Sequence, residues 1–366
     1  MMTALRRKTP PLLAVSMGDP AGVGPEVILK AAAALARRRG PPSIVVVGDL
    51  SAMRAEAARL RSVPAPCEWR QGEVPIRLTK GLGVLSISSL SARAIRPAHP
   101  TVEGGGAAYD YIVSGARMAM SGEVDALVTA PISKDWMNRA GHHFPGHSEL
   151  LAQMSRTRLW RMMFAGGELT VALVTAHMGF AKVASALTRH NVFDTIRLLS
   201  AHMRGALGVA RPRIAVLGLN PHAGESGMFG DEEIRVIAPA IRRAQRDGID
   251  AYGPLAPDTA FIRKAGAFGF DAAVAMYHDQ GLIALKTLEF ERAVNVTLGL
   301  PFVRTSPDHG TAYDIAGYGA ANGASMLAAM EYAWRVVDSG ARKERGGAPA
   351  EKVPTRAVRE KAGRKA

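Results

Sequence analysis

Short apolar segments alternate with longer amphipathic segments along most of this chain. Several apolar segments lack the polar alternation of a strand with one wet face, which is typical of strands covered on both sides. They occupy residues 12–17, 43–48, 83–88, 125–130, 169–176, 213–219, 272–277 and 293–299. Helical periodicity marks residues 25–38, 108–122, 190–207, 232–248 and 323–340. This alternation predicts an α/β fold with a largely parallel sheet.

The body of the chain is expected to form two interleaved α/β lobes. Its 366 residues suffice for a sizeable core, and neither an internal repeat nor a Gly/Ser/Pro-rich linker divides residues 11–338. We expect residues 1–10 to be flexible. Residues 339–366 are rich in charge, Ala, Gly and Pro and poor in large apolar side chains, so they predict a basic disordered tail.

The formal net charge of +14 is concentrated at the two ends. Residues 339–366 contribute +6, and residues 6–8 contribute +3. Only about +5 remains for the body, which argues against nucleic acid as the main partner. The tail is expected to be solvated, and a weak contact with a polyanion is the alternative.

Composition also bears on the compartment. Cys67 is the only cysteine, which excludes an internal disulfide and a cysteine-based zinc site. No apolar run reaches the roughly 18 residues of a membrane helix, and the first residues lack the apolar core of a secretory signal. We therefore expect a cytoplasmic protein with no membrane partner.

Three histidines each follow an apolar segment that is predicted to be a buried strand. His177 ends VALVTAH, His222 ends RIAVLGLNPH and His278 ends DAAVAMYH. The carboxyl ends of parallel strands meet at one edge of an open sheet, where ligands bind. Three imidazoles at that edge can hold one metal ion and leave coordination positions open for a substrate. Taken alone, this pattern leaves hydrolase and oxidoreductase chemistry open.

Two further segments have features of anion sites. The glycine-rich turn at 17–30 joins a strand to a helix, but its spacing is neither a Rossmann fingerprint nor a P-loop, so it is a weak phosphate signal. Within 129–154, His147 and Ser148 follow a Gly- and Pro-flanked loop and open a helix. Ser148 either caps that helix or, with His147, grips a phosphate at its N-terminus.

A polar segment precedes the final helix. Asn295 and Arg304 offer an amide and a guanidinium fork, which suit a phosphate or a carboxylate. Asp308, Gly310 and Thr311 lie in a loop that suits a ribose or pyrophosphate through backbone amides and short side chains. An ordinary ordered loop is the alternative.

Together these segments resemble the 4-hydroxythreonine-4-phosphate dehydrogenase family of pyridoxal phosphate biosynthesis. The matching motifs run in family order from about residue 12 to 335, and the basic tail lies outside them. They are GDPAGVGPE, VTAPISK, GHSE, VTAH, NPHAGE, GPLAPDT, YHDQG and VNVTLGLPFVRTSPDHGTAYDIAG. The resemblance implies a homodimer with the two-lobed fold of isocitrate and isopropylmalate dehydrogenases and a cleft between the lobes.

The resemblance also implies the reaction. The family oxidises the secondary alcohol of a small phosphorylated hydroxy amino acid with NAD or NADP, and the β-keto acid then loses CO2. A divalent metal, Zn, Mg or Co, is implied at His177, His222 and His278, in a site shared across the dimer interface. The implied substrate-binding positions are His147, Ser148, Lys286, Asn295 and Arg304. Asp308, Gly310 and Thr311 remain the candidates for the nicotinamide cofactor.

Two catalytic roles follow from this site. Lys286 is expected to hold and orient the substrate. Asp279 is the candidate proton acceptor, because it adjoins His278.

The chain departs from the family pattern at two places. Ser148 stands where the family usually has Thr, which keeps the hydroxyl. After His177 the family usually has an aliphatic residue and Pro, whereas this chain has Met178-Gly179-Phe180. The leading substrate is 4-phosphohydroxy-L-threonine, and the alternative is a paralogue acting on 4-phospho-erythronate, 4-phospho-threonate or another hydroxy acid. A zinc hydrolase and a nucleic-acid-binding protein are the alternatives from other classes.

Overall fold

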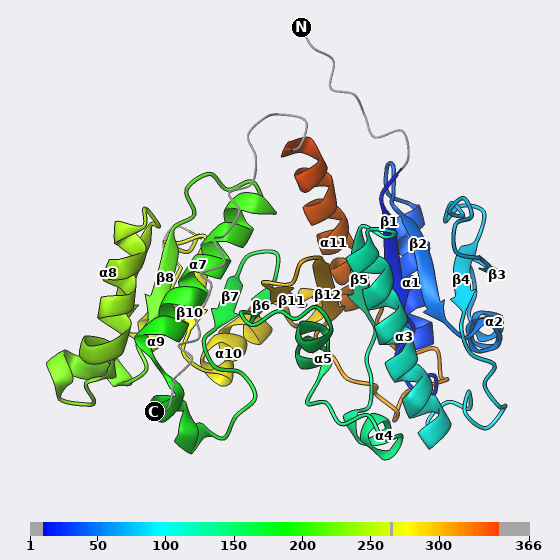
Figure 1. The fold of residues 1–366 in the computed structure, drawn as a ribbon, viewed down its shortest axis with the longest axis horizontal. Helices are drawn as coiled ribbons and strands as arrows, with labels where there is room; N and C mark the ends of the chain where they lie inside the picture. Colours follow the sequence, from blue (N-terminus) through cyan, green and yellow to red (C-terminus); the bar gives the residue numbers. More distant parts are fainter. Residues whose placement is uncertain (1–9, 264–265, 344–366) are drawn as a thin grey trace, which may run out of the picture.

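The computed structural model describes residues 10–263 and 266–343, which form two helix-flanked lobes on one continuous twelve-stranded sheet (Figure 1). The strands of the first lobe are β1 (Leu12–Ser16), β2 (Ser43–Gly48), β3 (Pro66–Glu68), β4 (Leu82–Ser86) and β5 (Ala126–Thr129). Those of the second lobe are β7 (Thr170–Leu173), β8 (Ile214–Leu217), β9 (Ala251–Leu255) and β10 (Ala272–Ala275). Between them lie β6 (Arg161–Ala165), β11 (Val294–Leu298) and β12 (Val303–Pro307).

The sheet consists of two parallel groups joined by antiparallel strands. Its order is β3-β4-β2-β1-β5-β12-β11-β6-β7-β10-β8-β9. Only β12–β11, β11–β6 and β6–β7 pair antiparallel. The predicted α/β fold with a largely parallel sheet is therefore confirmed, and the strand direction reverses in the middle, where the lobes meet.

Helices cover both faces of the sheet (Figure 1). The α-helices of the first half are α1 (Gly24–Ala36), α2 (Leu50–Arg59), α3 (Val102–Ser121), α4 (Lys134–Arg139) and α5 (His147–Met154). Those that follow are α6 (Val183–Ala186), α7 (Arg189–Gly205), α8 (Ala238–Arg246), α9 (Pro257–Ala260), α10 (His278–Glu289) and α11 (Ala324–Lys343). Short 3-10 helices span η1 (Phe180–Lys182), η2 (Pro221–Gly227) and η4 (Phe290–Arg292), and a π-helical turn, η3 (Glu233–Ile237), leads into α8. No helix in the described part of the chain combines the length and apolarity needed to cross a membrane.

All eight predicted strands form, and four strands escaped prediction. Strand β9 contains a glycine and a proline, which its edge position tolerates. Strand β6 is rich in methionine rather than β-branched residues, and β12 contains three consecutive polar residues, two of which line the site described below. Strand β3 is only three residues long.

The final helix extends farther than the sequence predicts. Helix α11 continues to Lys343, so the first five residues of the predicted tail, 339–343, are helical. The rest of that tail and residues 1–9 lie outside the described residues. Helix α3 also begins earlier than predicted, at Val102, because its three consecutive glycines are accommodated by close packing.

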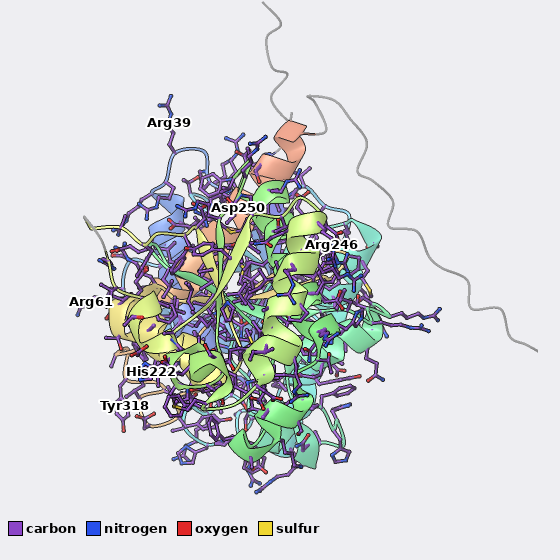
Figure 2. The ribbon with its side chains drawn as sticks, turned by 90° about the vertical axis from the view of Figure 1, so that its left-hand side faces the viewer. Arg39, Arg61, His222, Arg246, Asp250 and Tyr318 are labelled. Atoms are coloured by element: carbon purple, nitrogen blue, oxygen red, sulfur yellow. The ribbon has the colours of Figure 1, made fainter. Side chains whose placement is uncertain are left out.

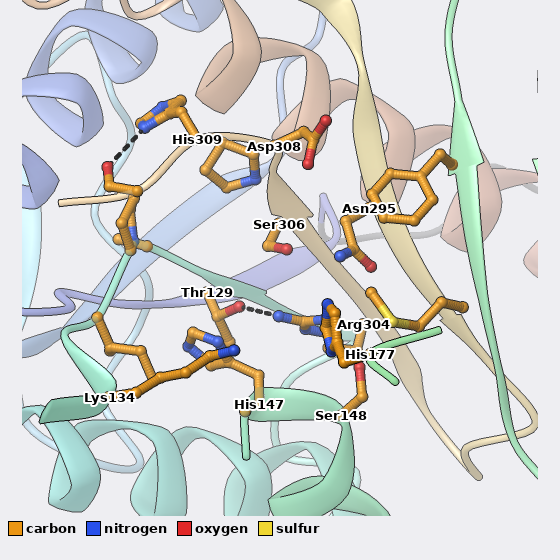
Figure 3. Close-up of a pocket in the computed structure, with 18 of the residues that line it drawn as sticks. Thr129, Lys134, His147, Ser148, His177, Asn295, Arg304, Ser306, Asp308 and His309 are labelled. Atoms are coloured by element: carbon orange, nitrogen blue, oxygen red, sulfur yellow. Dashed lines mark hydrogen bonds between the residues drawn. The ribbon is translucent and has the colours of Figure 1, made fainter. Parts of the chain in front are cut away.

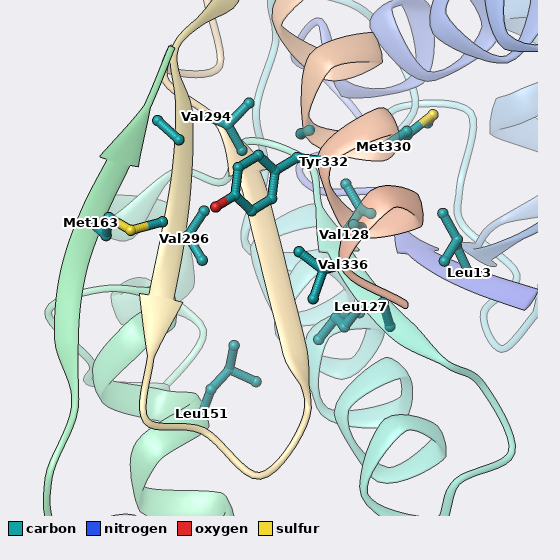
Figure 4. Close-up of a cluster of buried hydrophobic side chains, with 14 of the residues drawn as sticks. Leu13, Leu127, Val128, Leu151, Met163, Val294, Val296, Met330, Tyr332 and Val336 are labelled. Atoms are coloured by element: carbon teal, nitrogen blue, oxygen red, sulfur yellow. The ribbon is translucent and has the colours of Figure 1, made fainter. Parts of the chain in front are cut away.

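The main core lies where α11 packs on the central strands (Figure 4). Tyr332 and Val336 of α11 meet Val294 and Val296 of β11, and all four are buried. Tyr332 also accepts or donates a hydrogen bond of 2.8 Å with His202 of α7. Helix α11 thereby ties the central strands to the helix layer of the second lobe.

Two adjacent glycines in α3 provide a stability test. A Cβ on Gly105 would lie 2.4 Å from the carbonyl oxygen of Trp136 in α4, whereas one on Gly106 would make an ordinary 3.6 Å contact with Ala140. Gly105→Ala should therefore lower the free energy of unfolding by about 1–3 kcal/mol. Gly106→Ala should raise it by about 0.5–1 kcal/mol through helix propensity. Denaturant titration of both variants checks this, and equal effects would contradict the close α3–α4 packing.

Candidate active site

A cavity of about 390 Å³ lies where the two lobes meet, and it gathers most of the predicted site residues (Figure 3). Its predicted members are His147, Ser148, His177, His278, Lys286, Asn295, Arg304, Asp308 and Gly310. His222, Asp279 and Thr311 do not line it. Sequence reasoning therefore located the right segments, and the structure separates the residues that share a cavity from those that do not.

The floor of the cavity is one face of the central strands. Asn295 of β11 pairs with Ser306 of β12 and with Phe164 of β6, and all three line the cavity. Residues two apart along a strand share a face, so Arg304 accompanies Ser306. The polar residues that make β12 hard to predict therefore include two, Arg304 and Ser306, that form the cavity floor.

Arg304 is a buried cation whose contacts are all neutral. Its side chain is 2% exposed, and its guanidinium donates to the hydroxyls of Thr129 (2.7 Å) and Thr297 (3.0 Å). It forms no ion pair with any described residue, and its Nε has no hydrogen-bond acceptor there. Burial lowers the pKa of Arg304 to about 10, so it stays charged at neutral pH. The Glu149 carboxylate raises the pKa of Arg304 from beyond ion-pair distance, so the charge is only partly compensated. A buried charge without a direct ion pair is costly, which favours a bound anion at this site.

Ser148 belongs to the same network. It lies inside α5, where its hydroxyl is 3.0 Å from that of Thr297, and the helix has no side-chain cap. The capping interpretation of Ser148 is therefore wrong, because Gly146 occupies the N-cap position. Thr297 links Ser148 to Arg304, so the two predicted substrate residues are held by one bridging hydroxyl.

His147 is a neutral group facing the same space. Loss of solvation lowers its pKa well below the usual value, and the charges of Arg304 and Lys134 lower it further. Its Nε2 is buried and has no protein partner in the described part of the chain. A neutral ring beside a buried guanidinium can donate or accept a hydrogen bond without adding repulsion.

Lys286 and Asp308 form an ion pair of 3.0 Å across the cavity. The pair joins α10 to the end of β12, and so it joins a predicted substrate residue to a predicted cofactor residue. Lys286 is therefore already compensated by a carboxylate, in contrast to Arg304.

The three predicted metal ligands follow three neighbouring parallel strands, β7, β10 and β8. His177 and His278 line the cavity, with ring centroids 5.8 Å apart. Loss of solvation, followed by the charge of Lys134, lowers the pKa of His177 and favours the neutral imidazole that binds metals. Asp279, the candidate proton acceptor, instead contacts Nδ1 of His278 at 2.7 Å and is largely exposed.

His222 lies apart from the other two histidines, at the surface of the second lobe (Figure 2). It sits in η2, where five consecutive residues, 222–226, have positive φ. No three His, Cys, Asp or Glu side chains of residues 10–263 and 266–343 converge closely enough to hold a metal ion. A single chain therefore does not bring the three histidines together, and the metal site shared between two subunits stays a prediction.

Glu233 holds the strained loop in place. Its carboxylate accepts hydrogen bonds from the backbone N–H of Leu219 (2.7 Å) and Asn220 (2.8 Å) and from the Asn220 side chain (3.0 Å). Glu233 is 3% exposed, and a Cβ on Gly224 would lie 2.7 Å from its Oε2. Positive φ at non-glycine residues costs free energy and persists only where neighbours enforce it, and Glu233 is that neighbour here.

The predicted cofactor loop packs against the first glycine-rich turn. Thr311 accepts a hydrogen bond from Val23 through its carbonyl, at 2.9 Å, and a Cβ on Gly22 would lie 2.9 Å from the same oxygen. Tyr313 donates to Asp19 at 2.7 Å. The glycine-rich turn therefore packs against the predicted cofactor loop. In that loop, Gly310 lines the cavity and Thr311 does not.

Several cavity residues escaped the predicted set. They are Thr129, Lys134, Glu149 and Ser306, and Thr297 supports the cavity wall through its contacts with Ser148 and Arg304. Lys134 and Glu149 stand in motifs that the sequence already marks, VTAPISK and GHSE. The hydroxyl residues carry no signal of their own, because a threonine in a strand is ordinary and only its register places it on the cavity face.

A cleft between two α/β lobes that presents cations, imidazoles and hydroxyls defines a small-molecule enzyme. The family model described as pyridoxal phosphate biosynthetic protein PdxA matches residues 41–333. The chain belongs to the PdxA family and is an oxidoreductase, which confirms the resemblance read from its motifs and sets the hydrolase alternative aside.

Individual relatives span nearly the whole body. A 4-hydroxythreonine-4-phosphate dehydrogenase of Maricaulis maris is 46% identical over 332 residues, which are 89% of this chain and 97% of that protein. A D-threonate 4-phosphate dehydrogenase of Pectobacterium atrosepticum is 41% identical, covering 89% and 99%. The crystal structure of 4-hydroxythreonine-4-phosphate dehydrogenase from Klebsiella pneumoniae aligns with a TM-score of 0.79 at 38% identity, covering 89% and 99%.

Glu233 supplies a test of the loop that carries His222. Glu233→Gln turns an acceptor into an NH2 group that faces the NH2 of Asn220, so the loop should lose about 1–3 kcal/mol of local stability. Hydrogen exchange at the amides of Leu219 and Asn220 should accelerate accordingly. Glu232→Gln is the matched control, since Glu232 contacts only the Asn220 side chain. Equal acceleration in both variants would contradict the role of Glu233.

Proposed function

We propose that this protein oxidises 4-phosphohydroxy-L-threonine with NAD or NADP, assisted by a divalent metal. The product, 2-amino-3-oxo-4-(phosphooxy)butanoate, then decarboxylates to 3-amino-2-oxopropyl phosphate, an intermediate of pyridoxal 5'-phosphate biosynthesis. The observation that carries this proposal is the buried, only partly compensated guanidinium of Arg304 beside the imidazoles of the cavity. The names of the similar proteins supply the substrate class.

The anion side of the cavity suits a phosphate monoester. Such a group carries a charge of about −1.5 to −2 and offers three acceptor oxygens. Arg304 presents its unpaired Nε, and His147 presents its unpaired Nε2. Ser148 and Asn295 add a hydroxyl and an amide at the same wall. These donors would hold the phosphate and so orient the neighbouring carbon that bears the hydroxyl.

The imidazole side fits a divalent metal such as Zn, Co or Mg. His177 and His278 present two rings to the cavity, and His222 follows the next parallel strand. Asp279 contacts Nδ1 of His278, which orients that ring and leaves Nε2 for a metal. A bound divalent ion would supply Lewis acidity that lowers the hydroxyl pKa and stabilises the ketone oxygen.

A homodimer is part of the proposal. Large apolar side chains lie exposed in the loops that carry two of the histidines: Met178 (41%) and Phe180 (73%) after His177, and Met228 (75%) and Phe229 (47%) after His222. A second copy docked there would cover these side chains and could complete the histidine set that one chain leaves incomplete. The cytoplasm remains the proposed location.

A bound NAD or NADP would accept the hydride from the alcohol carbon, and the hydroxyl proton would pass to water or to a base, for which Asp279 is the candidate, as the C=O bond forms. We place the cofactor beside Asp308, Gly310 and Thr311. The Lys286–Asp308 pair lies between this loop and the substrate space, so it would align the two reactants. In the β-keto acid, the C–CO2 bond then breaks, its electron pair passes into the adjacent carbonyl system, and the carbon takes up a proton.

The alternative substrate is 4-phospho-threonate or 4-phospho-erythronate. A D-threonate 4-phosphate dehydrogenase is 41% identical to this chain, and Met178-Gly179-Phe180 changes the loop beside His177. The donors for phosphate would serve either substrate, because 4-phospho-threonate and 4-phospho-erythronate differ from the leading substrate away from the phosphate.

A substrate panel tests the function. Purified protein should reduce NAD or NADP, followed by absorbance, with 4-phosphohydroxy-L-threonine in the presence of a divalent metal. A chelator should abolish turnover, and added metal should restore it. Preference for 4-phospho-threonate or 4-phospho-erythronate would move the substrate to the alternative, and turnover that survives the chelator would contradict the metal role.

Arg304 supplies the test of the anion site. Arg304→Met should lower kcat/KM for the phosphorylated substrate by a factor of about 100 or more, because charge-assisted bonds to the phosphate are lost. The same change removes an unpaired buried charge, so the melting temperature should stay equal or rise. Arg161→Met on neighbouring β6, outside the cavity, is the control. Unchanged kcat/KM in Arg304→Met would refute the proposed anion site.

A further inference from the structure

Lys134 lines the cavity but plays no part in the site assigned above. It begins α4, whose N-cap Ser133 accepts a hydrogen bond from Trp136. The helix is pressed against α3 at Gly105, so its position is well determined. Figure 3 shows the Lys134 side chain extended along the cavity wall, with its end beside His147.

The charges on the cavity wall are unevenly paired. The wall carries three cations, Lys134, Lys286 and Arg304, and two carboxylates, Glu149 and Asp308. Only Lys286 and Asp308 form an ion pair. Lys134 and Arg304 have no carboxylate at ion-pair distance among the described residues, although the charge of Glu149 acts on Arg304 from farther away. Two cations and one carboxylate, Glu149, are therefore left without an ion pair, and their net charge is positive.

Lys134 ends on the anion side of the cavity. A Cβ on Gly146 would lie 3.9 Å from Nζ of Lys134 and 3.1 Å from Glu149 Oε2. Gly146 is the N-cap residue of α5, which begins with His147 and Ser148. The ammonium group therefore lies near the start of α5, next to the residues proposed to face the phosphate, and its charge helps to lower the pKa of His147.

We propose that Lys134 is a second phosphate-binding cation, which closes over the phosphate opposite Arg304. A phosphate monoester carries about −1.5 to −2 charges, and the Glu149 carboxylate already offsets part of the charge of Arg304, so Lys134 supplies the positive charge that Arg304 alone lacks. An ammonium on a flexible stem suits this task, because it can reach the phosphate once the ligand is bound. The inference rests on the proposed function and extends it to a residue on a different helix.

Binding of inorganic phosphate tests the proposal without any turnover. Isothermal titration of the full chain should show phosphate binding that weakens by about 10- to 100-fold in Lys134→Met. Lys134→Arg should recover most of the affinity, because it keeps the charge. Arg139→Met is the matched control, since Arg139 lies on the same helix and is paired with Asp135 at 3.0 Å. Its phosphate affinity should equal that of the wild type.

The direction of the change in phosphate affinity distinguishes an electrostatic role of Lys134 from damage to the fold. Glu149→Gln removes the carboxylate beside Lys134, so it should strengthen phosphate binding, whereas a distorted cavity would weaken it. Acetate in place of phosphate should bind weakly and respond little to Lys134→Met. Equal phosphate affinity in wild type and Lys134→Met, or no phosphate binding to the wild type, would overturn the proposal. Failure to oxidise 4-phosphohydroxy-L-threonine while phosphate binding behaves as expected would refute the substrate and leave Lys134 assigned.

Discussion

The cavity depends on the antiparallel pairing of β11 with β12 on one side and with β6 on the other. These ladders join two parallel groups of strands whose directions differ, and they bring the lobes together over one face of the central strands. Register then decides which side chains face the cavity, because a slip of one residue would send Asn295, Arg304 and Ser306 to the opposite face. Helix α11 locks this register by packing Tyr332 and Val336 against β11.

The same register allows a buried cation to persist. Removing a guanidinium from water costs several kcal/mol, and each hydrogen bond to a charged group returns about 1.5–3 kcal/mol. The hydroxyls of Thr129 and Thr297 supply two such bonds to Arg304, which offsets much of the cost but leaves the charge only partly compensated. A carboxylate partner would stabilise the buried charge better, yet it would repel a phosphate. With hydroxyl partners, Arg304 is therefore less stabilised than it would be with a carboxylate, but its charge stays available to an anion.

In the second lobe, His278 and His222 are held in place by different kinds of structure. His278 starts α10 directly after β10, so its position follows from the helix and from Asp279. His222 stands in a loop of residues with positive φ, whose cost is met by the hydrogen bonds of Glu233. The position of His278 is thus set by regular structure, and that of His222 by a single buried carboxylate on a π-helical turn.

The sequence by itself determined the α/β class, eight of the strands, the family and nine of the residues that line the cavity, because apolar runs and local motifs are properties of neighbouring residues. It also placed the three histidines behind strands that are adjacent in the sheet. Only the tertiary structure decided which polar residues meet. The packing of distant segments places Thr129 and Thr297 beside Arg304 and pairs Lys286 with Asp308. It also brings Lys134 to the cavity and leaves His222 outside it. These outcomes follow from strand register and loop strain, which depend on contacts between segments far apart in the chain and therefore leave no local pattern.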